Sequence, residues 1–347
     1  MGLSLAVVGL GERGRRWARL ASMSRGVEVL ALVDPRVEVA KAARNALALD
    51  VPVFPSLQEA IRDGLPLEGA VVALPLRSRE AALREALALR LHVLVEPPAA
   101  GSLPEVCSFL FRAEAKGLLL KQALWLRHSP PIRAMRRRLW ERRLGAPIGG
   151  LMLCLHEPGR EWEAVQPLSA LLSLLGRAPQ ECMKERYALR LDFGEGLQFG
   201  LALGPSGDAM QGILVVCEGG ALLWDGRGAF VREGRRGLRW RLEDPLGFKW
   251  PGSGEAPGGF LPLPPDPGPS GEEALLARFR TEAERGREQK EAVEEELLPL
   301  ALLEACRLAQ RTGKPHRPAE LIEGPTEGGG HVEASKRIEE GAKGDRG

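Results

Sequence analysis

The stretch Ser4-Leu-Ala-Val-Val-Gly9-Leu-Gly11-Glu-Arg-Gly14 decides the fold of the first half of this chain. A short apolar run that ends in glycine is typical of a buried parallel strand, and a helical pattern follows it. Gly9 permits a tight turn, Gly11 lets the backbone approach a pyrophosphate, and Gly14 lets helix and strand pack closely. The helix N-terminus offers N–H donors to phosphate oxygens. The segment therefore predicts a dinucleotide-binding turn.

A second apolar run, residues 27–33, ends at Asp34. An acidic side chain at the tip of the second strand can accept both ribose hydroxyls of NAD. Arg36 lies just beyond it and could pair with the 2′-phosphate of NADP, which Asp34 would repel. Because Asp34 holds the closer position, the sequence favours NAD over NADP.

Strands and helices alternate as far as residue 124, which predicts an α/β domain with a doubly wound parallel sheet over residues 1–124. Beyond residue 150 the pattern changes to strand-like runs separated by glycine-rich turns, and it predicts a mostly antiparallel sheet in a second domain, residues 125–320. These runs are residues 150–156, 183–193, 196–203, 212–217, 221–224 and 238–242, with one helix over 165–175.

The last hundred residues contain two segments of biased composition. Residues 251–271 are rich in proline and glycine and are expected to form a linker without regular structure. A helical region follows over 272–311, broken near Gly286. Residues 324–347 are rich in glycine and charge and are expected to be disordered.

Composition excludes several classes of protein. The chain has 347 residues, 44% of them hydrophobic, and a formal net charge of +2, so it can bury a large core and carries no global charge for nucleic acid or an anionic membrane. The five cysteines are widely spaced, which indicates buried thiols and not a metal site. The basic run Arg133–Arg143 is interpreted as a solvated helix face. No secretion signal or membrane-spanning run is found, so a cytoplasmic protein is expected.

The order of motifs resembles the Gfo/Idh/MocA family of glucose-fructose oxidoreductases and inositol dehydrogenases. The Rossmann half carries the resemblance in the glycine turn, in Val71-Val-Ala-Leu-Pro75 and in Leu91-His-Val-Leu-Val-Glu96-Pro-Pro98. The later segments that resemble family motifs are Leu126-Arg-His-Ser-Pro130, Leu171-Leu-Ser-Leu-Leu-Gly176, Val216-Cys-Glu-Gly-Gly-Ala-Leu222 and Leu303 to Pro315.

The resemblance implies a Rossmann domain joined to a domain with an open, mostly antiparallel sheet. It implies hydride transfer between NAD(P) and a sugar or polyol, a small-molecule substrate, and a homodimer or homotetramer that assembles through that sheet. The residues expected to contact the cofactor are Gly9, Leu10, Gly11, Glu12, Arg13, Gly14, Asp34, Arg36, Leu74, Pro75 and Glu96.

The catalytic positions of the family are replaced in this chain. The resemblance places the family's lysine at Pro97, its aspartate at Trp162 and its histidine at Gln166. A further helix-borne aspartate falls on Ser169, and a histidine after the third strand falls on Arg79. Oxidation of an alcohol needs a base for the hydroxyl proton, worth about 10²- to 10⁴-fold in rate. The usual chemistry of the family is therefore expected to be absent.

Two residues could substitute as the catalytic base. Glu96 adjoins the nicotinamide position, where a dry pocket can raise the pKa of a carboxyl group, and His156 could face the same cleft. Equally, Glu96 could cap a helix or bind ribose, and His156 could be a surface or core histidine. Glu161 and Glu163 flank the lost aspartate and could also be solvated charges. Trp125, Arg127, Trp162 and Gln166 are expected to line a substrate pocket, although the two tryptophans could equally pack in the core.

Three functions remain open at this point. One is an oxidoreductase with a non-standard catalytic site. Another is a non-catalytic NAD(H)-binding regulatory or scaffold protein. The third is a redox-neutral lyase or glycosidase-like enzyme that uses NAD transiently.

Overall fold

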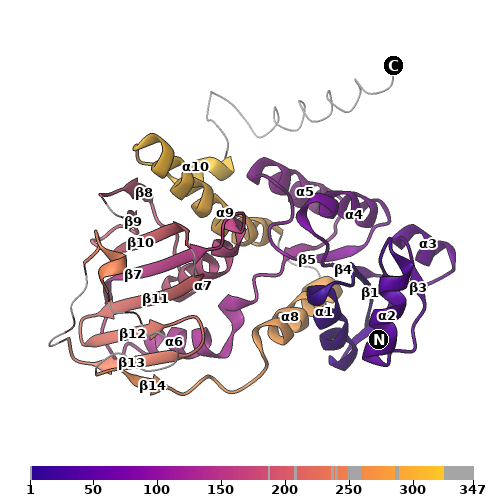
Figure 1. Cartoon of the computed structure of the whole chain (residues 1–347), viewed down its shortest axis with the longest axis horizontal. Coiled ribbons are helices and arrows are strands. Elements are labelled where there is room, and N and C mark those ends of the chain that lie inside the picture. Colours follow the sequence, from indigo (N-terminus) through magenta and orange to yellow (C-terminus); the bar gives the residue numbers. More distant parts are fainter. Residues whose placement is uncertain are drawn as a thin grey trace.

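The computed structural model describes residues 2–186, 188–206, 209–235, 238, 241–248, 250, 259–285 and 289–323. These residues form two sheets with helices packed on and between them, seen at the two ends of the molecule in Figure 1. The tail at 324–347, expected to be disordered, lies outside the described residues.

The first sheet is parallel and has the strand order β3-β2-β1-β4-β5-β6. This order is that of a Rossmann fold, so the predicted doubly wound domain is confirmed. Its strands are β1 (Leu3–Val8), β2 (Val27–Val33), β3 (Val53–Phe54), β4 (Gly69–Val72), β5 (His92–Val95) and β6 (Leu120–Gln122). The sequence pattern missed β3 because two residues are too few to show an alternation.

Helices cover both faces of this sheet, because successive residues of a strand point to opposite faces. On β1, Leu5 and Val7 pack with helices α1 and α2, whereas Ala6 and Val8 face the side of α3, α4 and α5. These helices are α1 (Glu12–Met23), α2 (Val37–Leu47), α3 (Leu57–Arg62), α4 (Leu76–Ala88) and α5 (Leu103–Ala115).

The second sheet has eight strands in the order β14-β13-β12-β11-β7-β10-β9-β8. Its neighbours are antiparallel except for the parallel pair β7 and β10, which confirms a mostly antiparallel sheet. The strands are β7 (Pro147–His156), β8 (Glu181–Lys184), β9 (Leu189–Asp192), β10 (Gln198–Pro205), β11 (Met210–Cys217), β12 (Gly220–Trp224), β13 (Ala229–Glu233) and β14 (Leu261–Leu263).

Helices α7 (Val165–Leu175) and α9 (Gln289–Thr312) pack on one face of the second sheet. Helix α9 also contacts α5, so one continuous apolar cluster joins the two halves of the molecule. On the opposite face of the sheet, Phe248 and Phe260 pack against Leu214 and Leu223. The chain therefore covers part of that outer face with its own residues.

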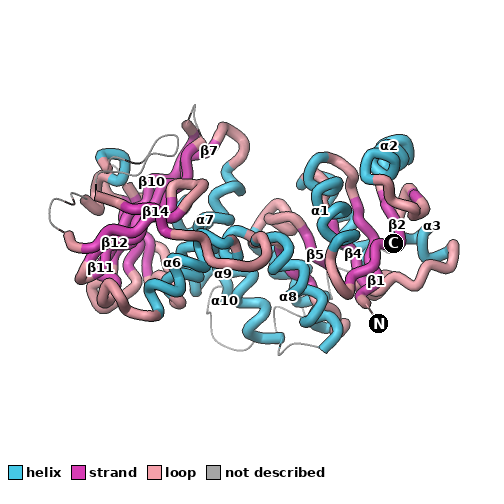
Figure 2. Tube along the Cα trace, turned by 90° about the horizontal axis from the view of Figure 1, so that it is seen from below, coloured by secondary structure: helices cyan, strands magenta, loops and turns pink. Residues whose placement is uncertain are grey.

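Helix α8 (Gly271–Arg285) returns to the Rossmann sheet after the chain has completed the second one (Figure 2). Its residues Leu275, Leu276 and Phe279 are fully buried in the same cluster as β1 and α1. The division of the chain at residue 124 stays a prediction, but the Rossmann half has one covering helix that comes from residues 271–285.

Three details of the predicted second half were wrong. The run 183–193 is a hairpin of β8 and β9 because the chain reverses between them. The expected strand at 238–242 is not formed by the described residues there, since Leu238, Arg241 and Leu242 lie outside any strand. The 251–271 linker does hold regular structure, because β14 pairs with β13; residues 251–258 lie outside the described residues.

Shortening the Phe279 side chain tests whether α8 packs on the Rossmann sheet. We expect Phe279→Ala to lower the free energy of unfolding by about 3–5 kcal/mol, because a fully buried aromatic ring leaves a cavity in the core of the Rossmann half. Phe111→Ala, which removes a ring that is 48% exposed on α5, is the matched control. Equal unfolding midpoints for the two variants in urea would contradict the packing of α8 on this sheet.

Candidate functional site

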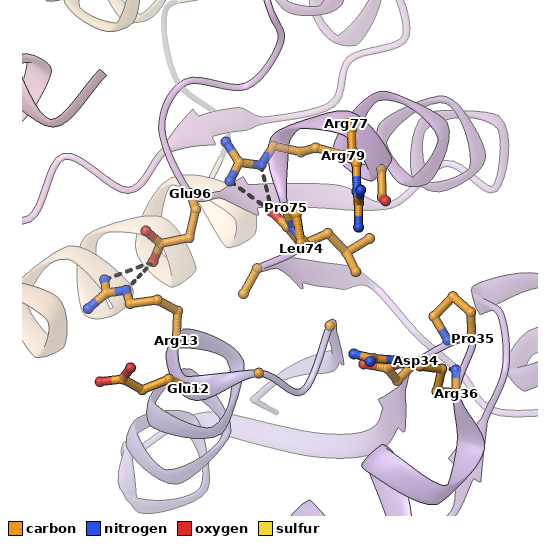
Figure 3. A pocket seen from close by; sticks show the side chains of 14 residues that line it. Glu12, Arg13, Asp34, Pro35, Arg36, Leu74, Pro75, Arg77, Arg79 and Glu96 are labelled. Carbon is orange, nitrogen blue, oxygen red and sulfur yellow. Dashed lines mark hydrogen bonds and ion pairs between the residues drawn. The ribbon is translucent and has the colours of Figure 1, made fainter. Parts of the chain in front are cut away.

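A cavity of about 650 Å³ lies at the carboxyl ends of the parallel strands (Figure 3). Each of four strands supplies a wall residue just past its end: Gly9 after β1, Asp34 after β2, Leu74 after β4 and Glu96 after β5. Ligands of open α/β sheets bind at this edge, beside the point where the strand order reverses. The volume is within the range of cofactor sites, about 300–1,000 Å³.

The glycine turn has the geometry that the phosphate-binding interpretation requires. Gly9 has φ +85°, in the left-handed region that favours glycine. A Cβ atom placed on Gly14 would lie 1.6 Å from the carbonyl oxygen of Gly9, so α1 approaches β1 as closely as only glycine allows. A Cβ atom on Gly11 would meet nothing within 4 Å. Gly11 thus leaves its space to the cavity, and the residues present fit a dinucleotide at the N-terminus of α1.

The carboxylate of Asp34 is buried at the end of β2 and is fixed by two backbone donors. The N–H of Leu10 donates to Oδ2 at 3.0 Å, and the N–H of Arg36 donates to Oδ1 at 2.9 Å. The Arg36 guanidinium lies 3.7 Å from Oδ1 and is 78% exposed. Asp34 therefore holds the glycine turn to the second strand and keeps a negative charge on the cavity wall.

Glu96 lies on the opposite wall in an ion pair with the glycine-turn helix. Its Oε1 accepts from Arg13 Nη2 at 2.8 Å, Arg13 Nε at 3.1 Å and Trp17 Nε1 at 2.5 Å. Although burial acts in the opposite direction, Glu96 and Glu272 raise the pKa of Arg13. Among the described residues, Oε2 of Glu96 has no hydrogen-bond partner, so it is the oxygen left for a ligand.

Three residues of α4 that the sequence analysis did not assign to cofactor binding also line the cavity: Arg77, Ser78 and Arg79. Arg79 is buried, and its guanidinium donates to the carbonyl oxygens of Leu74 and Pro98. Burial lowers the pKa of Arg79 to about 10, partly offset by the charge of Glu96. Arg79 therefore braces the loops after β4 and β5, whereas Arg77 is exposed on the wall. The position of Arg77, Ser78 and Arg79 shortly after Pro75, an expected cofactor residue, was the sequence feature that could have identified them.

Nine of the eleven expected cofactor residues line this cavity, and Leu10 and Gly14 do not. Leu10 is fully buried and uses its N–H on Asp34, while Gly14 is used for the close contact with Gly9. The residues on the wall are Gly9, Gly11, Glu12, Arg13, Asp34, Arg36, Leu74, Pro75 and Glu96.

The structure does not bring the four expected substrate-pocket residues to this cavity. Gln166 is used on backbone, since its Nε2 donates to Ala123 O at 2.8 Å and its Oε1 accepts from Leu126 N at 3.2 Å. Trp125 packs between the apolar clusters, and Trp162 lies under Arg307, whose Cζ is 4.6 Å from the ring centroid. These three side chains therefore contribute to packing at the junction of the two halves.

His156 also lies away from the cofactor cavity. It is 3% exposed at the end of β7, where its Nδ1 is 3.0 Å from the carbonyl oxygen of Glu157. It lines a separate cavity of about 200 Å³ with Glu161 and Arg307. Because no residue lines both cavities, the expectation that His156 faces the same cleft as Glu96 is not met.

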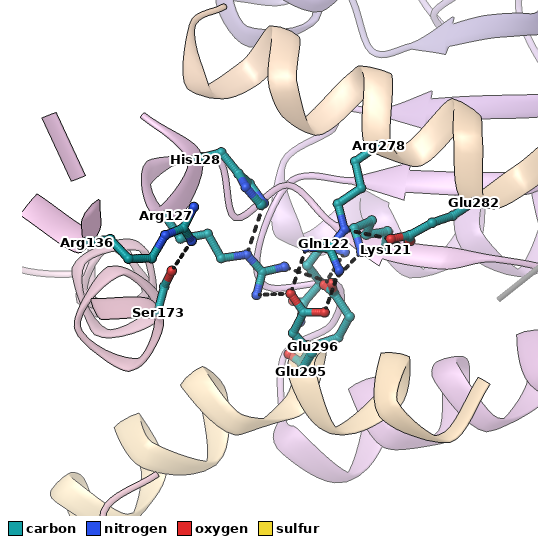
Figure 4. A network of polar contacts seen from close by, with 10 residues as sticks. All are labelled: Lys121, Gln122, Arg127, His128, Arg136, Ser173, Arg278, Glu282, Glu295 and Glu296. Atoms are coloured by element: carbon teal, nitrogen blue, oxygen red, sulfur yellow. Dashed lines mark hydrogen bonds and ion pairs between the residues drawn. The ribbon is translucent and has the colours of Figure 1, made fainter. Parts of the chain in front are cut away.

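Arg127, the fourth expected pocket residue, belongs to a buried cluster of charges (Figure 4). Its guanidinium pairs with Glu295 at 3.1 Å and with Glu296 at 3.2 Å. Lys121 on β6, 1% exposed, pairs with Glu296 at 3.3 Å and with Glu282 at 3.1 Å. Breaking such a buried pair leaves an uncompensated charge. Arg127 therefore serves to join the Rossmann sheet to α8 and α9.

Comparison with known proteins agrees with this geometry. Residues 3–123 match the sequence model of the oxidoreductase family with an NAD-binding Rossmann fold, Gfo/Idh/MocA. The Rossmann half is therefore similar in sequence to the Gfo/Idh/MocA oxidoreductase family. The match confirms the resemblance seen in the sequence, and the nicotinamide cofactor expected from the glycine turn is a property of this family. A search of curated proteins found no match.

Several solved structures share the fold over 89–92% of this chain. An oxidoreductase from Agrobacterium radiobacter, in complex with NAD⁺, L-tartaric acid and magnesium, is 16% identical with a TM-score of 0.69, over 92% of this chain and 100% of that one. A 3-ketoreductase from Actinomadura kijaniata with NADP is 18% identical with a TM-score of 0.69, over 89% and 98%. An aldose-aldose oxidoreductase from Caulobacter crescentus, complexed with glycerol, is 17% identical with a TM-score of 0.72, over 91% and 100%.

No helix of the described part of the chain has the length and apolar character needed to cross a membrane.

Substitutions at the two glycines separate binding from folding. We expect Gly11→Val to weaken NAD(H) binding about tenfold or more, which is about 1.4 kcal/mol of binding free energy, without lowering the melting temperature, because the valine side chain enters the cavity.

We expect Gly14→Ala to lower the free energy of unfolding by about 1–3 kcal/mol or more, because the alanine Cβ would overlap the backbone of Gly9. Calorimetric titration and thermal unfolding check both, and full NAD(H) affinity in Gly11→Val would contradict the assigned site.

Proposed function

We propose that the protein is an NAD(P)-dependent oxidoreductase that acts on a small carbonyl or hydroxyl compound, such as a sugar or polyol, with a non-standard catalytic site. The observation that carries the proposal is the cavity around the glycine turn, with Asp34 on one wall and Glu96 on the other. Similarity of the Rossmann half to an oxidoreductase family supports it. Asp34 supports NAD as the preferred cofactor, since its charge repels a 2′-phosphate.

The bound nicotinamide would supply or accept the hydride. A residue of the chain must then move the proton of the reacting hydroxyl. Pro97, at the position of the family's lysine, cannot hold a proton on its side chain. Oε2 of Glu96 is the carboxylate atom on the wall that keeps no partner among the described residues, while Arg13 and Trp17 orient it through Oε1. We therefore assign proton transfer to Glu96.

One observation favours a second candidate, a non-catalytic NAD(H)-binding protein. Three donors already converge on Oε1 of Glu96, as is typical of a carboxylate with a structural role. In that case Glu96 would hold the glycine-turn helix in place, and the cavity would bind cofactor without turnover.

Turnover measurements with Glu96→Gln distinguish the two candidates. With NADH or NADPH and a panel of aldoses, ketoses and polyols, we expect wild-type turnover with at least one substrate and a preference for NADH. We expect Glu96→Gln to lower kcat by about 10²-fold or more, because amide nitrogen and oxygen cannot relay the proton. Glu320→Gln, an exposed carboxylate on α10 (Pro318–Glu323), is the control for the charge change.

The remaining outcomes assign the other candidates. Binding of NADH without oxidation by any carbonyl substrate would favour the non-catalytic protein. Product formation without net consumption of cofactor would favour a redox-neutral enzyme. Full activity of Glu96→Gln would remove Glu96 from proton transfer.

We also propose a cytoplasmic homodimer or homotetramer that assembles through the second sheet. Strand β14 is an edge of that sheet, and its Leu261 side chain is 69% exposed, which supports a contact between copies at this edge. Light scattering after gel filtration is expected to give two or four times the 37.6 kDa of one chain, and Leu261→Lys is expected to reduce the mass. A wild-type monomer would contradict this assembly.

A further inference from the structure

A second cavity, of about 230 Å³, lies between α6 (Pro130–Trp140), α7 and α9, and shares no residue with the cofactor cavity. Four arginines and one glutamate line it, together with His128 and two serines of α7. The polar residues on its wall are Arg127, Arg136, Arg177, Arg278, His128, Glu295, Ser169 and Ser173. Arginines therefore outnumber acidic residues on the wall.

Among the described residues, Arg136 is the arginine of this cavity that forms no ion pair. Arg127, Arg177 and Arg278 each form ion pairs with carboxylates. Arg136 donates from Nη1 to the hydroxyl of Ser173 at 2.9 Å, and it pairs with no carboxylate among the described residues (Figure 4). Burial, followed by the charges of Arg133 and Arg278, lowers the pKa of Arg136, and the charge of Asp266 offsets part of this effect.

Ser169 provides an independent observation. Its side chain is 2% exposed and lies on the wall of the cavity, and its Oγ has no hydrogen-bond partner among the described residues. Buried hydroxyl groups are normally satisfied, and one that is not costs about 1–3 kcal/mol. An unsatisfied hydroxyl on the same wall as a guanidinium without an ion pair indicates a site for an acceptor from outside the chain.

His128 shows that the positive potential extends along the cavity. Burial and the charges of Arg127, Arg278 and Lys121 lower the pKa of His128 to about 3. The imidazole is therefore neutral at pH 7, and it can contribute a hydrogen bond without adding a further charge to the wall.

We propose that this cavity binds a small anion, the carboxylate or phosphate group of a metabolite, held by Arg136 and Ser169. A guanidinium binds such oxyanions through two parallel N–H donors, and the serine hydroxyl supplies a third. The volume equals about seven or eight water molecules at roughly 30 Å³ each, which limits the ligand to a short organic acid or phosphate ester. The site is separate from the cofactor cavity, so the proposal does not depend on the proposed function.

Calorimetric titration of the full chain with inorganic phosphate and with malonate tests the site and distinguishes the two oxyanion chemistries. We expect saturable binding of at least one probe, weakened tenfold or more in Arg136→Gln. Arg138→Gln, which removes the same charge from the same helix but does not line the cavity, should bind as the wild type does. The Gly11→Val variant should also keep this binding. If phosphate bound instead at the glycine turn, Gly11→Val would lose it.

A substitution that places a carboxylate of the chain itself in the cavity provides a second test. Because this variant is expected to be more stable, its loss of binding would not reflect misfolding. We expect Ser169→Asp to raise the melting temperature above that of Ser169→Asn, because its carboxylate would pair with Arg136, and to abolish phosphate and malonate binding. Four outcomes would each overturn the proposal. They are the absence of saturable binding of either probe, binding that survives in Arg136→Gln, a loss of binding in Arg138→Gln equal to that in Arg136→Gln, and a melting temperature of Ser169→Asp below that of Ser169→Asn.

Discussion

The contact between Gly14 on α1 and the carbonyl oxygen of Gly9, just after β1, sets the position of α1 relative to the cofactor cavity. Because no side chain separates the two backbones, α1 begins directly above the sheet edge and its first turn faces the cavity. Arg13 and Trp17 then reach Glu96, just after β5, and Arg13 and Arg16 reach Glu272 at the start of α8. One close approach thus aligns three distant segments.

Buried charge joins the two halves of the molecule. Lys121, Arg127, Glu282 and Glu296 come from β6, from the turn after it and from α8 and α9, and all four are largely excluded from water. Ions in such places are stable only when each has its partner, so the pairs permit few arrangements of the two sheets. Near this junction, in the part of the chain that the structure describes, Arg136 forms no ion pair and Ser169 Oγ has no hydrogen-bond partner, and both line the second cavity.

Local patterns predicted the Rossmann half and most of its site. The glycine turn, Asp34 and the motif around Glu96 are each contained in a few consecutive residues, and the carboxyl ends of parallel strands meet at one edge, so their meeting could be expected. The expected substrate-pocket residues do not line the cofactor cavity, for the opposite reason. Trp125, Arg127, Trp162 and Gln166 lie on elements whose relative placement depends on contacts across the whole chain, and their side chains are used in packing, in backbone hydrogen bonds and in ion pairs.

The sequence by itself determined the parallel sheet and the glycine turn with its acidic residue, because strand periodicity, glycine geometry and residue identity are local properties. Only the tertiary structure decided that α8 covers the first sheet, that Arg13 and Trp17 fix one oxygen of Glu96, and that Arg127, Arg136, Arg177 and Arg278 line a separate cavity. These features depend on pairs of residues far apart in the sequence, and their energies arise only when burial removes water from between them.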